Sequence, residues 1–198
     1  MVKNELLREF GRKAFHQLSL VYLGAFYYFG WPRIGALMGA WFAVVLAVET
    51  ARLKIPAIER ALVGFFDGLM RESERKHFSG IFHTTAGSLA AMLIARGDPV
   101  IVGAAILQLA LADSASALVG KAYGRTKLFG GMKSLEGSLG GLAVGFAGAL
   151  ACGVRPAAAL AAALAGALAE LLPTTPWVND NLWIPVASAA ALVLASAK

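Results

Sequence analysis

The 198-residue sequence predicts an all-α protein that is embedded in a membrane as one helical bundle. Hydrophobic residues make up 58% of the chain and charged residues only 15%, whereas about 25% of the residues in soluble domains are charged. The apolar residues gather in seven runs, each close to the length of about 20 residues that a helix needs to cross a bilayer. The charged residues lie mainly between alternate runs. The sequence therefore predicts a polytopic integral membrane protein with about seven transmembrane helices.

The seven runs cover residues 15–31, 33–51, 78–95, 99–120, 137–154, 156–172 and 182–197. Hydrocarbon offers no water to the backbone polar groups, so each run should form a helix whose hydrogen bonds are internal. Between several runs stand Pro and Gly, which favour turns. Because the runs occupy most of the chain, we expect residues 1–198 to form a single membrane domain.

Residues 56–76 differ from the apolar runs and predict an amphipathic helix. Apolar residues recur there at helical spacing, among them Ile58, Leu62 and Phe65, while charged residues such as Arg60 fill much of the remainder. Pro56 suits the first turn of a helix. We expect this helix to lie at the membrane surface. A helical extension that packs on the protein itself is the alternative.

The distribution of Lys and Arg predicts how the chain is oriented. If the seven runs are spans, fourteen of the 18 Lys and Arg residues lie on the side of the N-terminal segment. The positive-inside rule then puts the N-terminus and the loops after the second, fourth and sixth spans in the cytoplasm. The net charge of +6 therefore indicates topology and contact with anionic membrane lipids, and we expect no nucleic-acid partner.

The fifth run carries a ridge of small residues, Gly137, Gly141 and Gly145. Such a ridge allows two helices in a membrane to approach closely. We expect it to pack inside the bundle, with formation of a homodimer as the alternative.

Three carboxylates lie inside apolar runs, each toward the predicted cytoplasmic end: Glu49, Asp113 and Glu170. A carboxylate at the centre of a membrane helix costs about 2.5–3.5 kcal/mol on insertion scales, so such groups need partners. We expect one inward-facing polar chamber. Ion pairs with Lys or Arg of other helices are the alternative.

The loop and helix start at residues 121–138 have a composition that suits phosphate binding. They contain Lys121, Arg125, Lys127 and Lys133 together with glycines and hydroxyl groups. Lys and Arg neutralise phosphates, glycines let backbone N–H groups approach an anion, and a helix N-terminus adds partial positive charge. A cationic loop that merely touches anionic lipid is the alternative.

A divalent cation would accompany phosphate chemistry, and Mg²⁺ binds few carboxylates besides phosphate oxygens. Asp113, Glu136 and Asp180 are the candidate metal ligands. His16 follows two cations at the start of the first run and is a candidate phosphate contact.

Several other site types are excluded by the sequence. The single cysteine, Cys152, permits neither an internal disulfide nor a cysteine-based metal site. The chain contains no P-loop motif, no Gly-x-Ser-x-Gly and no His-Glu-x-x-His. His77 and His83 stand six residues apart, which is poor helical spacing for a shared metal, and we expect them to be structural.

Three segments of the chain carry motifs of polar and small residues. The first is Arg12-Lys13-Ala-Phe-His16. The second runs from Leu-Ala-Asp113 through Gly120 and Gly124-Arg125 to Lys133-Ser134-Leu-Glu136-Gly137-Ser138. The third is Glu170 followed by Asp180-Asn181-Leu-Trp-Ile-Pro185. These segments resemble the CTP-dependent lipid-alcohol kinases, the family of dolichol kinase, phytol kinase and yeast-type diacylglycerol kinase. They cover most of the chain in the family's order, with one departure at Ala112, where the family usually has Gly.

The resemblance implies a phosphotransferase with an alcohol group as acceptor, which moves the γ-phosphoryl group of CTP to a membrane lipid in the presence of Mg²⁺ or another divalent cation. Polyprenol or dolichol, phytol, geranylgeraniol and diacylglycerol are the acceptors it allows. The catalytic residues would be Asp113, Lys133, Glu136 and Asp180. The residues that bind the nucleotide would be Arg12, Lys13, His16, Lys121, Gly124, Arg125, Lys127, Ser134, Gly137, Ser138 and Asn181.

Two alternatives remain open. Phosphatidate cytidylyltransferase, a CDP-lipid synthase, shares the Asp-x-x-Ala and Lys-Ser/Thr-x-Glu-Gly elements but ends in Asp-Arg-x-Asp, where this chain reads Asn179-Asp180-Asn181-Leu182. A non-catalytic transporter or lipid-binding protein would need a polar path through both leaflets, and the apolar runs show none. We therefore expect CTP, a lipid alcohol and membrane lipids as partners, and an active site on the cytoplasmic side.

Overall fold

The computed structural model describes residues 17–65, 76–128, 130, 133–172, 175 and 179–196. Within these residues the protein is all-α, as predicted. The helices are α2 (Leu18–Phe29), α3 (Arg33–Lys54), α4 (Pro56–Phe65), α5 (Gly80–Ile94), α6 (Pro99–Leu107), the π-helical turn η2 (Gln108–Ala112), α7 (Asp113–Tyr123), α8 (Leu135–Ala151), α9 (Pro156–Leu171) and α10 (Asp180–Ser196). Two short strands, β1 (Lys127–Leu128) and β2 (Lys133–Ser134), pair as an antiparallel hairpin between α7 and α8.

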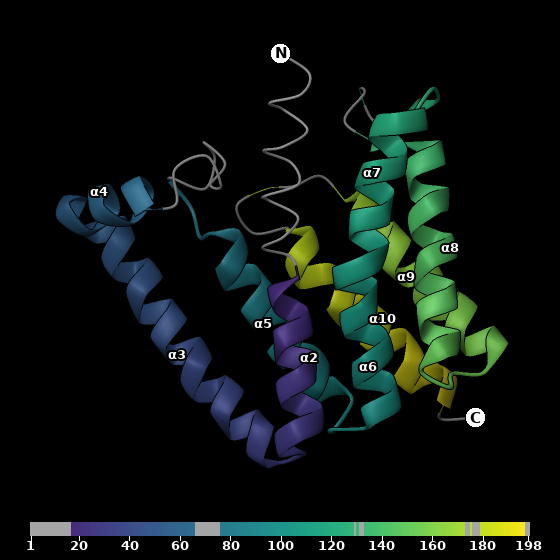
Figure 1. Ribbon diagram of the computed structural model, residues 1–198, viewed down its shortest axis with the longest axis horizontal. Helices are drawn as coiled ribbons and strands as arrows, with labels where there is room; N and C mark the ends of the chain where they lie inside the picture. Colours follow the sequence, from purple (N-terminus) through teal and green to yellow (C-terminus); the bar gives the residue numbers. More distant parts are fainter. Residues whose placement is uncertain are drawn as a thin grey trace.

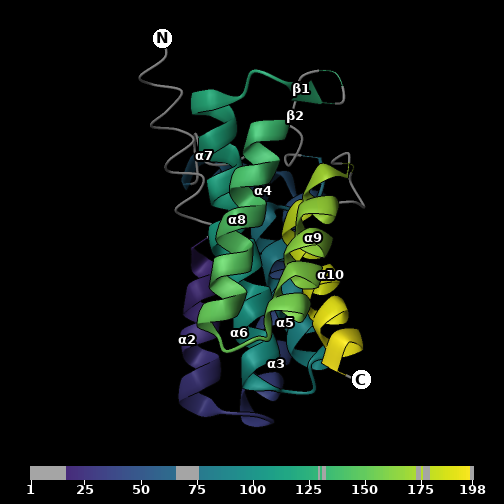
Figure 2. The same ribbon diagram turned by 90° about the vertical axis from the view of Figure 1, so that its right-hand side faces the viewer.

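The helices run up and down through one bundle. Figures 1 and 2 show the α2–α3, α5–α6 and α8–α9 connections toward one end and the hairpin between α7 and α8 at the other. Each of the seven predicted runs contains described helix, because α6, η2 and α7 follow one another without a break. The helical assignment of the runs is therefore confirmed, with ends that differ from the predicted boundaries by a few residues.

Two helical stretches are long and apolar enough to cross a membrane by length and composition. They are Arg33–Lys54 and Pro99–Tyr123, with 22 and 25 residues. The other helices that correspond to predicted spans are apolar but contain 10 to 17 residues each. Length alone therefore supports a membrane span at two of the seven runs.

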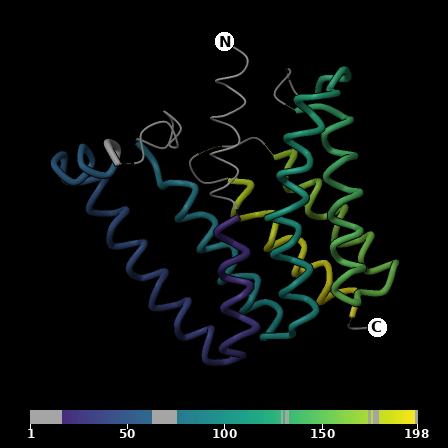
Figure 3. The backbone as a smooth tube through the Cα atoms, in the orientation of Figure 1, coloured from purple at the N-terminus to yellow at the C-terminus, as the bar shows by residue number. Residues whose placement is uncertain are grey.

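The predicted amphipathic segment begins as a helix. α4 starts at Pro56, in agreement with the preference of proline for the first turn, and is described as far as Phe65. Figure 3 shows α4 lying across the end of α3 rather than continuing along its axis. Residues 66–75 of the predicted segment lie outside the described residues.

The glycine ridge of α8 packs inside the bundle, as predicted. A Cβ atom on Gly137 would lie 2.7 Å from the carbonyl oxygen of Ser116, and one on Gly141 would lie 3.0 Å from that of Ala112. One on Gly145 would lie 2.1 Å from Oε1 of Gln108. Because a side chain at Gly137 would meet backbone and one at Gly145 would meet the Gln108 amide, glycine allows α8 to lie close against α7 and η2.

The helix from Pro99 to Tyr123 contains a π-helical turn at Gln108–Ala112, immediately before Asp113. Ser114 Oγ donates a hydrogen bond to the Ala110 carbonyl at 2.8 Å, and Gln17 Nε2 donates to the same carbonyl at 3.1 Å. Turns of this kind are rare and frequently mark functional sites.

Candidate active site

A cavity lies where η2, α7, α8, α9 and α10 meet. Its polar lining consists of Gln108, Asp113, Ser116, Ser138 and Glu170. The remaining lining residues are small or apolar. The cavity volume is ≈ 10 Å³, and it is ≈ 250 Å³ when all empty space open to solvent is included. We call it the Asp113 cavity.

The polar side chains of the Asp113 cavity are withdrawn from solvent. Asp113 is 4% exposed, Glu170 6% and Gln108 1%. Burial of a carboxylate is costly unless hydrogen bonds or an opposite charge accompany it. Two buried carboxylates on one cavity therefore require hydrogen-bond donors or a cation nearby.

Lys133 supplies a positive charge. Its Nζ donates a hydrogen bond to Glu170 Oε1 and lies 3.9 Å from Asp180 Oδ2. Lys133 belongs to β2, whereas Glu170 lies at the end of α9 and Asp180 in the first turn of α10. The fold therefore brings an amine and two carboxylates together from three elements at the hairpin end of the bundle.

Several buried polar atoms around this site have no hydrogen-bond partner among the described residues. Glu170 Oε2, Ser138 Oγ and Gln108 Nε2 belong to residues that line the Asp113 cavity. Asn181 Oδ1 is a fourth such atom, in the first turn of α10 beside Asp180. A buried polar atom left unpaired costs about 1–3 kcal/mol. Such a concentration is typical of a site that binds a polar ligand.

Ser134 and Gly137 are hydrogen-bonded to each other at the start of α8. Ser134 is buried, and its Oγ accepts a hydrogen bond from the Gly137 N–H at 3.2 Å. Two glycines at the end of α7 leave space for the Ser134 side chain. A Cβ atom on Gly120 would lie 3.0 Å from Ser134 Oγ, and one on Gly124 would lie 2.6 Å from it. These predicted nucleotide-binding residues therefore form a helix cap that fixes Lys133 in front of α8.

Glu136 lies apart from the Asp113 cavity. Its carboxylate accepts hydrogen bonds from the Thr126 N–H at 3.0 and 3.2 Å, and so ties the start of the hairpin to α8. Hydrogen bonding to its own backbone N–H, and then to that of Thr126, lowers the pKa of the Glu136 carboxyl below its ordinary value. The residue precedes the predicted span at 137–154.

The predicted metal ligands Asp113, Glu136 and Asp180 do not form a cluster. The described residues contain no group of three or more His, Cys, Asp and Glu side chains that could hold a metal ion. Glu136 and Ser138 are two positions apart on α8, so their side chains point in nearly opposite directions. Because Ser138 faces the cavity, Glu136 faces the hairpin. The carboxylate that shares the cavity with Asp113 is Glu170.

The remaining predicted phosphate contacts are placed as follows. Lys121, Arg125 and Lys127 are exposed and do not line the Asp113 cavity. Asn181 is buried at the start of α10. Arg12, Lys13 and His16 lie outside the described residues.

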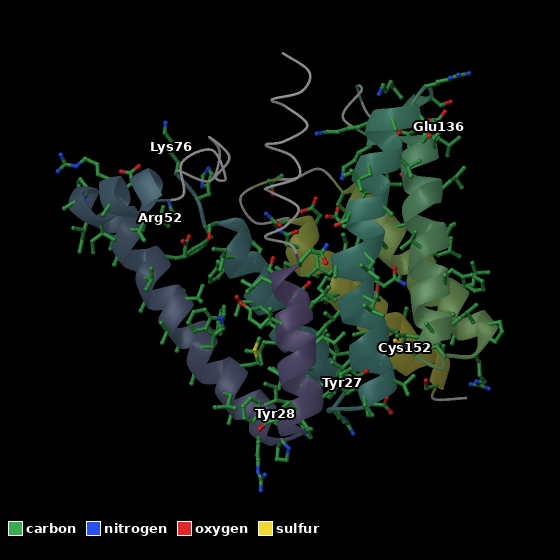
Figure 4. The ribbon with its side chains drawn as sticks, viewed as in Figure 1. Tyr27, Tyr28, Arg52, Lys76, Glu136 and Cys152 are labelled. Atoms are coloured by element: carbon green, nitrogen blue, oxygen red, sulfur yellow. The ribbon has the colours of Figure 1, made fainter. Side chains whose placement is uncertain are left out.

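Glu49 belongs to a second buried group rather than to the Asp113 cavity. Its Oε2 lies 2.8 Å from Arg52 Nη2 and accepts a hydrogen bond from the Ser79 N–H at 2.8 Å. Arg52 also donates to the His77 carbonyl at 2.6 Å, so the pair joins the end of α3 to the segment before α5. Figure 4 shows Arg52 and Glu136 at the same end of the molecule but on opposite sides of the bundle. One chamber containing all three carboxylates was expected, and Glu49 is instead paired with arginine.

Two cavity residues, Gln108 and Ser116, were not singled out as site residues in the sequence. Gln108 is a polar residue within an apolar run, five positions before Asp113. Polar residues inside predicted membrane helices are usually functional, so this position alone could have identified it. Ser116 stands three positions after Asp113, and this helical spacing places the two side chains on one face of the helix.

No family model, no curated protein and no solved structure matches this chain.

Proposed function

We propose that this protein is a CTP-dependent kinase that phosphorylates the hydroxyl group of a membrane lipid. The observation that carries the proposal is the contact of Lys133 with Glu170 and Asp180 beside the Asp113 cavity. These residues come from the second and third segments that resemble the lipid-alcohol kinases. Their convergence is what a shared active site requires.

We further propose that the bundle crosses the membrane about seven times with the hairpin end in the cytoplasm. Large apolar side chains face outward along several helices, for example Val21 (62% exposed), Leu168 (65%) and Leu194 (72%). Contact of these side chains with hydrocarbon carries no free-energy cost, whereas their exposure to water is unfavourable. Arg52, Lys76 and Glu136 gather at one end in Figure 4, which suits a bilayer boundary there.

In this proposal the cations of the hairpin end bind the nucleotide. Lys121, Arg125 and Lys127 are exposed around the hairpin and would neutralise the α- and β-phosphates of CTP. Lys133 would release part of its contact with Glu170 and stabilise the charge on the transferring γ-phosphoryl group. The first segment, with Arg12, Lys13 and His16, would add further phosphate contacts.

The cavity residues fit a divalent cation. Asp113 and Glu170 share one cavity, and Glu170 Oε2 is buried without a partner among the described residues. Mg²⁺ is commonly bound through one or two carboxylates together with substrate phosphates. When bound, it would neutralise charge on the β- and γ-phosphates. In this proposal Glu170 is the second carboxylate ligand, a role for which Glu136 was predicted from the sequence.

The reaction would be an in-line transfer. The hydroxyl oxygen of the lipid bonds to the γ-phosphorus of CTP while the bond from that phosphorus to the β–γ bridging oxygen breaks. CDP leaves with the bridging oxygen, and the hydroxyl proton passes to the Asp180 carboxylate, which lies beside Lys133. Because the transition state of phosphoryl transfer is loose, positioning and charge stabilisation contribute more than a strong base does.

The test uses the purified protein in lipid nanodiscs with CTP, Mg²⁺ and a panel of lipid alcohols. We expect CDP and a lipid monophosphate as products. Asp113→Asn and Lys133→Ala should lower kcat/KM at least a hundredfold, because each removes a charge from the site. Lys54→Ala, an exposed lysine at the end of α3, is the matched control and should leave activity unchanged.

Two outcomes would contradict the proposal. Pyrophosphate with a CDP-lipid would identify a cytidylyltransferase. Unchanged activity in both site variants would mean that the activity does not arise at this site.

A further inference from the structure

The Asp113 cavity has a charged end and a neutral end. The chain from Pro99 to Tyr123 rises toward the hairpin in Figure 1, so Gln108 lies farther from the hairpin than Asp113 does. Five residues of helix separate them by about 7.5 Å along the helix axis. Asp113 and Glu170 therefore form the charged end, with Lys133 in contact with Glu170, and Gln108 forms the neutral end.

Neighbouring helices leave space for the Gln108 side chain. A Cβ atom on Gly145 of α8 would lie 2.1 Å from Gln108 Oε1, and one on Gly166 of α9 would lie 3.3 Å from it. Because both positions are glycine, the Gln108 amide lies directly against the backbones of α8 and α9. The amide is 1% exposed, and its Nε2 has no partner among the described residues. A buried donor without an acceptor is destabilising, so a ligand that accepts a hydrogen bond is expected in front of it.

We propose that Gln108 binds the acceptor hydroxyl of the lipid by donating a hydrogen bond from Nε2 to the hydroxyl oxygen. The assignment of the bound group as a phosphoryl acceptor rests on the proposed kinase function. The hydroxyl would then face the charged end, where its oxygen meets the γ-phosphoryl group. Ser138 Oγ, also unpartnered within the described part of the chain, is a second polar contact on the same cavity.

The chemistry of the neutral end favours an uncharged ligand. Its donor is an amide without formal charge, so the neutral end offers no opposite charge to an anionic group. Ala112, Gly141 and Ala167 line the cavity beside the polar groups and offer apolar contact to the carbons next to the hydroxyl. The ligand class is a neutral alcohol on a slender hydrocarbon chain.

The variant that tests the assignment is Gln108→Met, which keeps the length of the side chain but removes the donor. Gln17→Met is the matched control. Gln17 contacts the same π-helical turn, because its Nε2 donates to Ala110 O, but it does not line the cavity. An effect that arises from the turn alone would therefore appear in both variants.

The first measurement is steady-state kinetics with geranylgeraniol and CTP. Gln108→Met should raise the KM for the alcohol roughly tenfold or more, because a hydrogen bond in a water-poor cavity is lost. The KM for CTP should stay within about twofold of the parent value, which also shows that the variant is folded. Gln108→Asn retains the donor on a shorter side chain and should give an intermediate KM for the alcohol. It provides the test if the methionine variant is unstable.

The second measurement does not depend on catalysis. The thermal midpoint of the nanodisc protein is recorded with geranylgeraniol and with the corresponding hydrocarbon that lacks the hydroxyl, both without nucleotide. The parent protein and Gln17→Met should be stabilised more by the alcohol, and Gln108→Met should show no preference.

The outcomes separate this inference from the proposed function. An unchanged KM for the alcohol, an intact preference for the alcohol in Gln108→Met, or an equal loss in Gln17→Met would overturn the role of Gln108. If the parent protein phosphorylates no alcohol but prefers the alcohol through Gln108, the binding role stands and the kinase proposal fails.

Discussion

At the residue scale, Lys133 balances the charge of two carboxylates that are largely removed from water. The side chains of Glu170 and Asp180 are 7% and 10% exposed. Lys133→Met would leave both without their cation, and we expect it to lower the free energy of unfolding by about 1–3 kcal/mol. Adding Glu170→Gln should restore most of the lost free energy of unfolding, because it removes the buried carboxylate charge that Lys133→Met leaves without its cation.

Denaturant unfolding of the single and double variants in detergent measures this coupling. Activity should be absent in both, which separates the structural role of the pair from its proposed catalytic role. Additive losses in the double variant would contradict the contact between Lys133 and Glu170.

Glu136 supports the hairpin, and its role should depend on pH. Because hydrogen bonds lower the pKa of its carboxyl, the contact with Thr126 is present above the ordinary titration range of a carboxyl group. It is lost only when the pH falls through the lower pKa of the folded protein.

The amide proton shift of Thr126, followed by NMR, should therefore titrate at a lower pH than Glu in an unfolded peptide. Glu136→Gln should abolish this titration and is the control. A midpoint at or above the peptide value would contradict the contact.

The candidate site could be predicted from the sequence only in part. Asp113 was recognisable because a carboxylate inside an apolar run requires partners. The partner of Lys133 could not be recognised in the sequence, because Glu170 stands 37 positions away. Only the packing of α8 and α9 brings the two residues together. Glu136 was assigned to the site by its neighbours in the sequence, whereas helical periodicity turns it toward the hairpin. Contacts between elements depend on tertiary packing, which spacing along the chain does not encode.

At the scale of elements, the close approach of α8 to α7 depends on glycine. Gly137→Ala would put a methyl group 2.7 Å from the Ser116 carbonyl oxygen, and backbone atoms cannot move aside cheaply. We expect a loss of about 1–3 kcal/mol in the free energy of unfolding. Gly39→Ala on α3 is the control: its new Cβ meets no atom within 4 Å, and it should stabilise the helix by up to about 1 kcal/mol.

Thermal or denaturant unfolding of the two variants distinguishes packing from intrinsic helix propensity. Equal stabilisation by both substitutions would show that α7 and α8 are not in close contact.

The helices themselves were largely predictable, because the apolar runs leave the backbone no alternative in hydrocarbon. The π-helical turn at Gln108–Ala112 was not. Its residues Gln-Leu-Ala-Leu-Ala are ordinary helix formers, so nothing in their composition indicates a wider turn. The ridge at Gly137 was predictable, since small residues at helical spacing have few uses other than close packing.

At the scale of the whole molecule, the proposed topology puts the two ends of the bundle on opposite sides of a membrane. In a variant with Cys152→Ala, single cysteines can be introduced by Arg33→Cys, Arg155→Cys, Lys76→Cys or Lys127→Cys. A maleimide that cannot cross membranes should modify the first two in intact cells. It should reach the last two only after permeabilisation, because the positive-inside rule keeps that end in the cytoplasm. Modification of all four positions in intact cells would contradict a spanning bundle.

We propose that the site transfers the γ-phosphoryl group of CTP to a lipid hydroxyl. The most direct measurement follows phosphorus from CTP labelled at either the α- or the γ-position into the lipid fraction, with purified protein, Mg²⁺ and a lipid alcohol. We expect γ-label to appear in the lipid and α-label to stay in CDP. Appearance of α-label in the lipid, or of neither label, would contradict it.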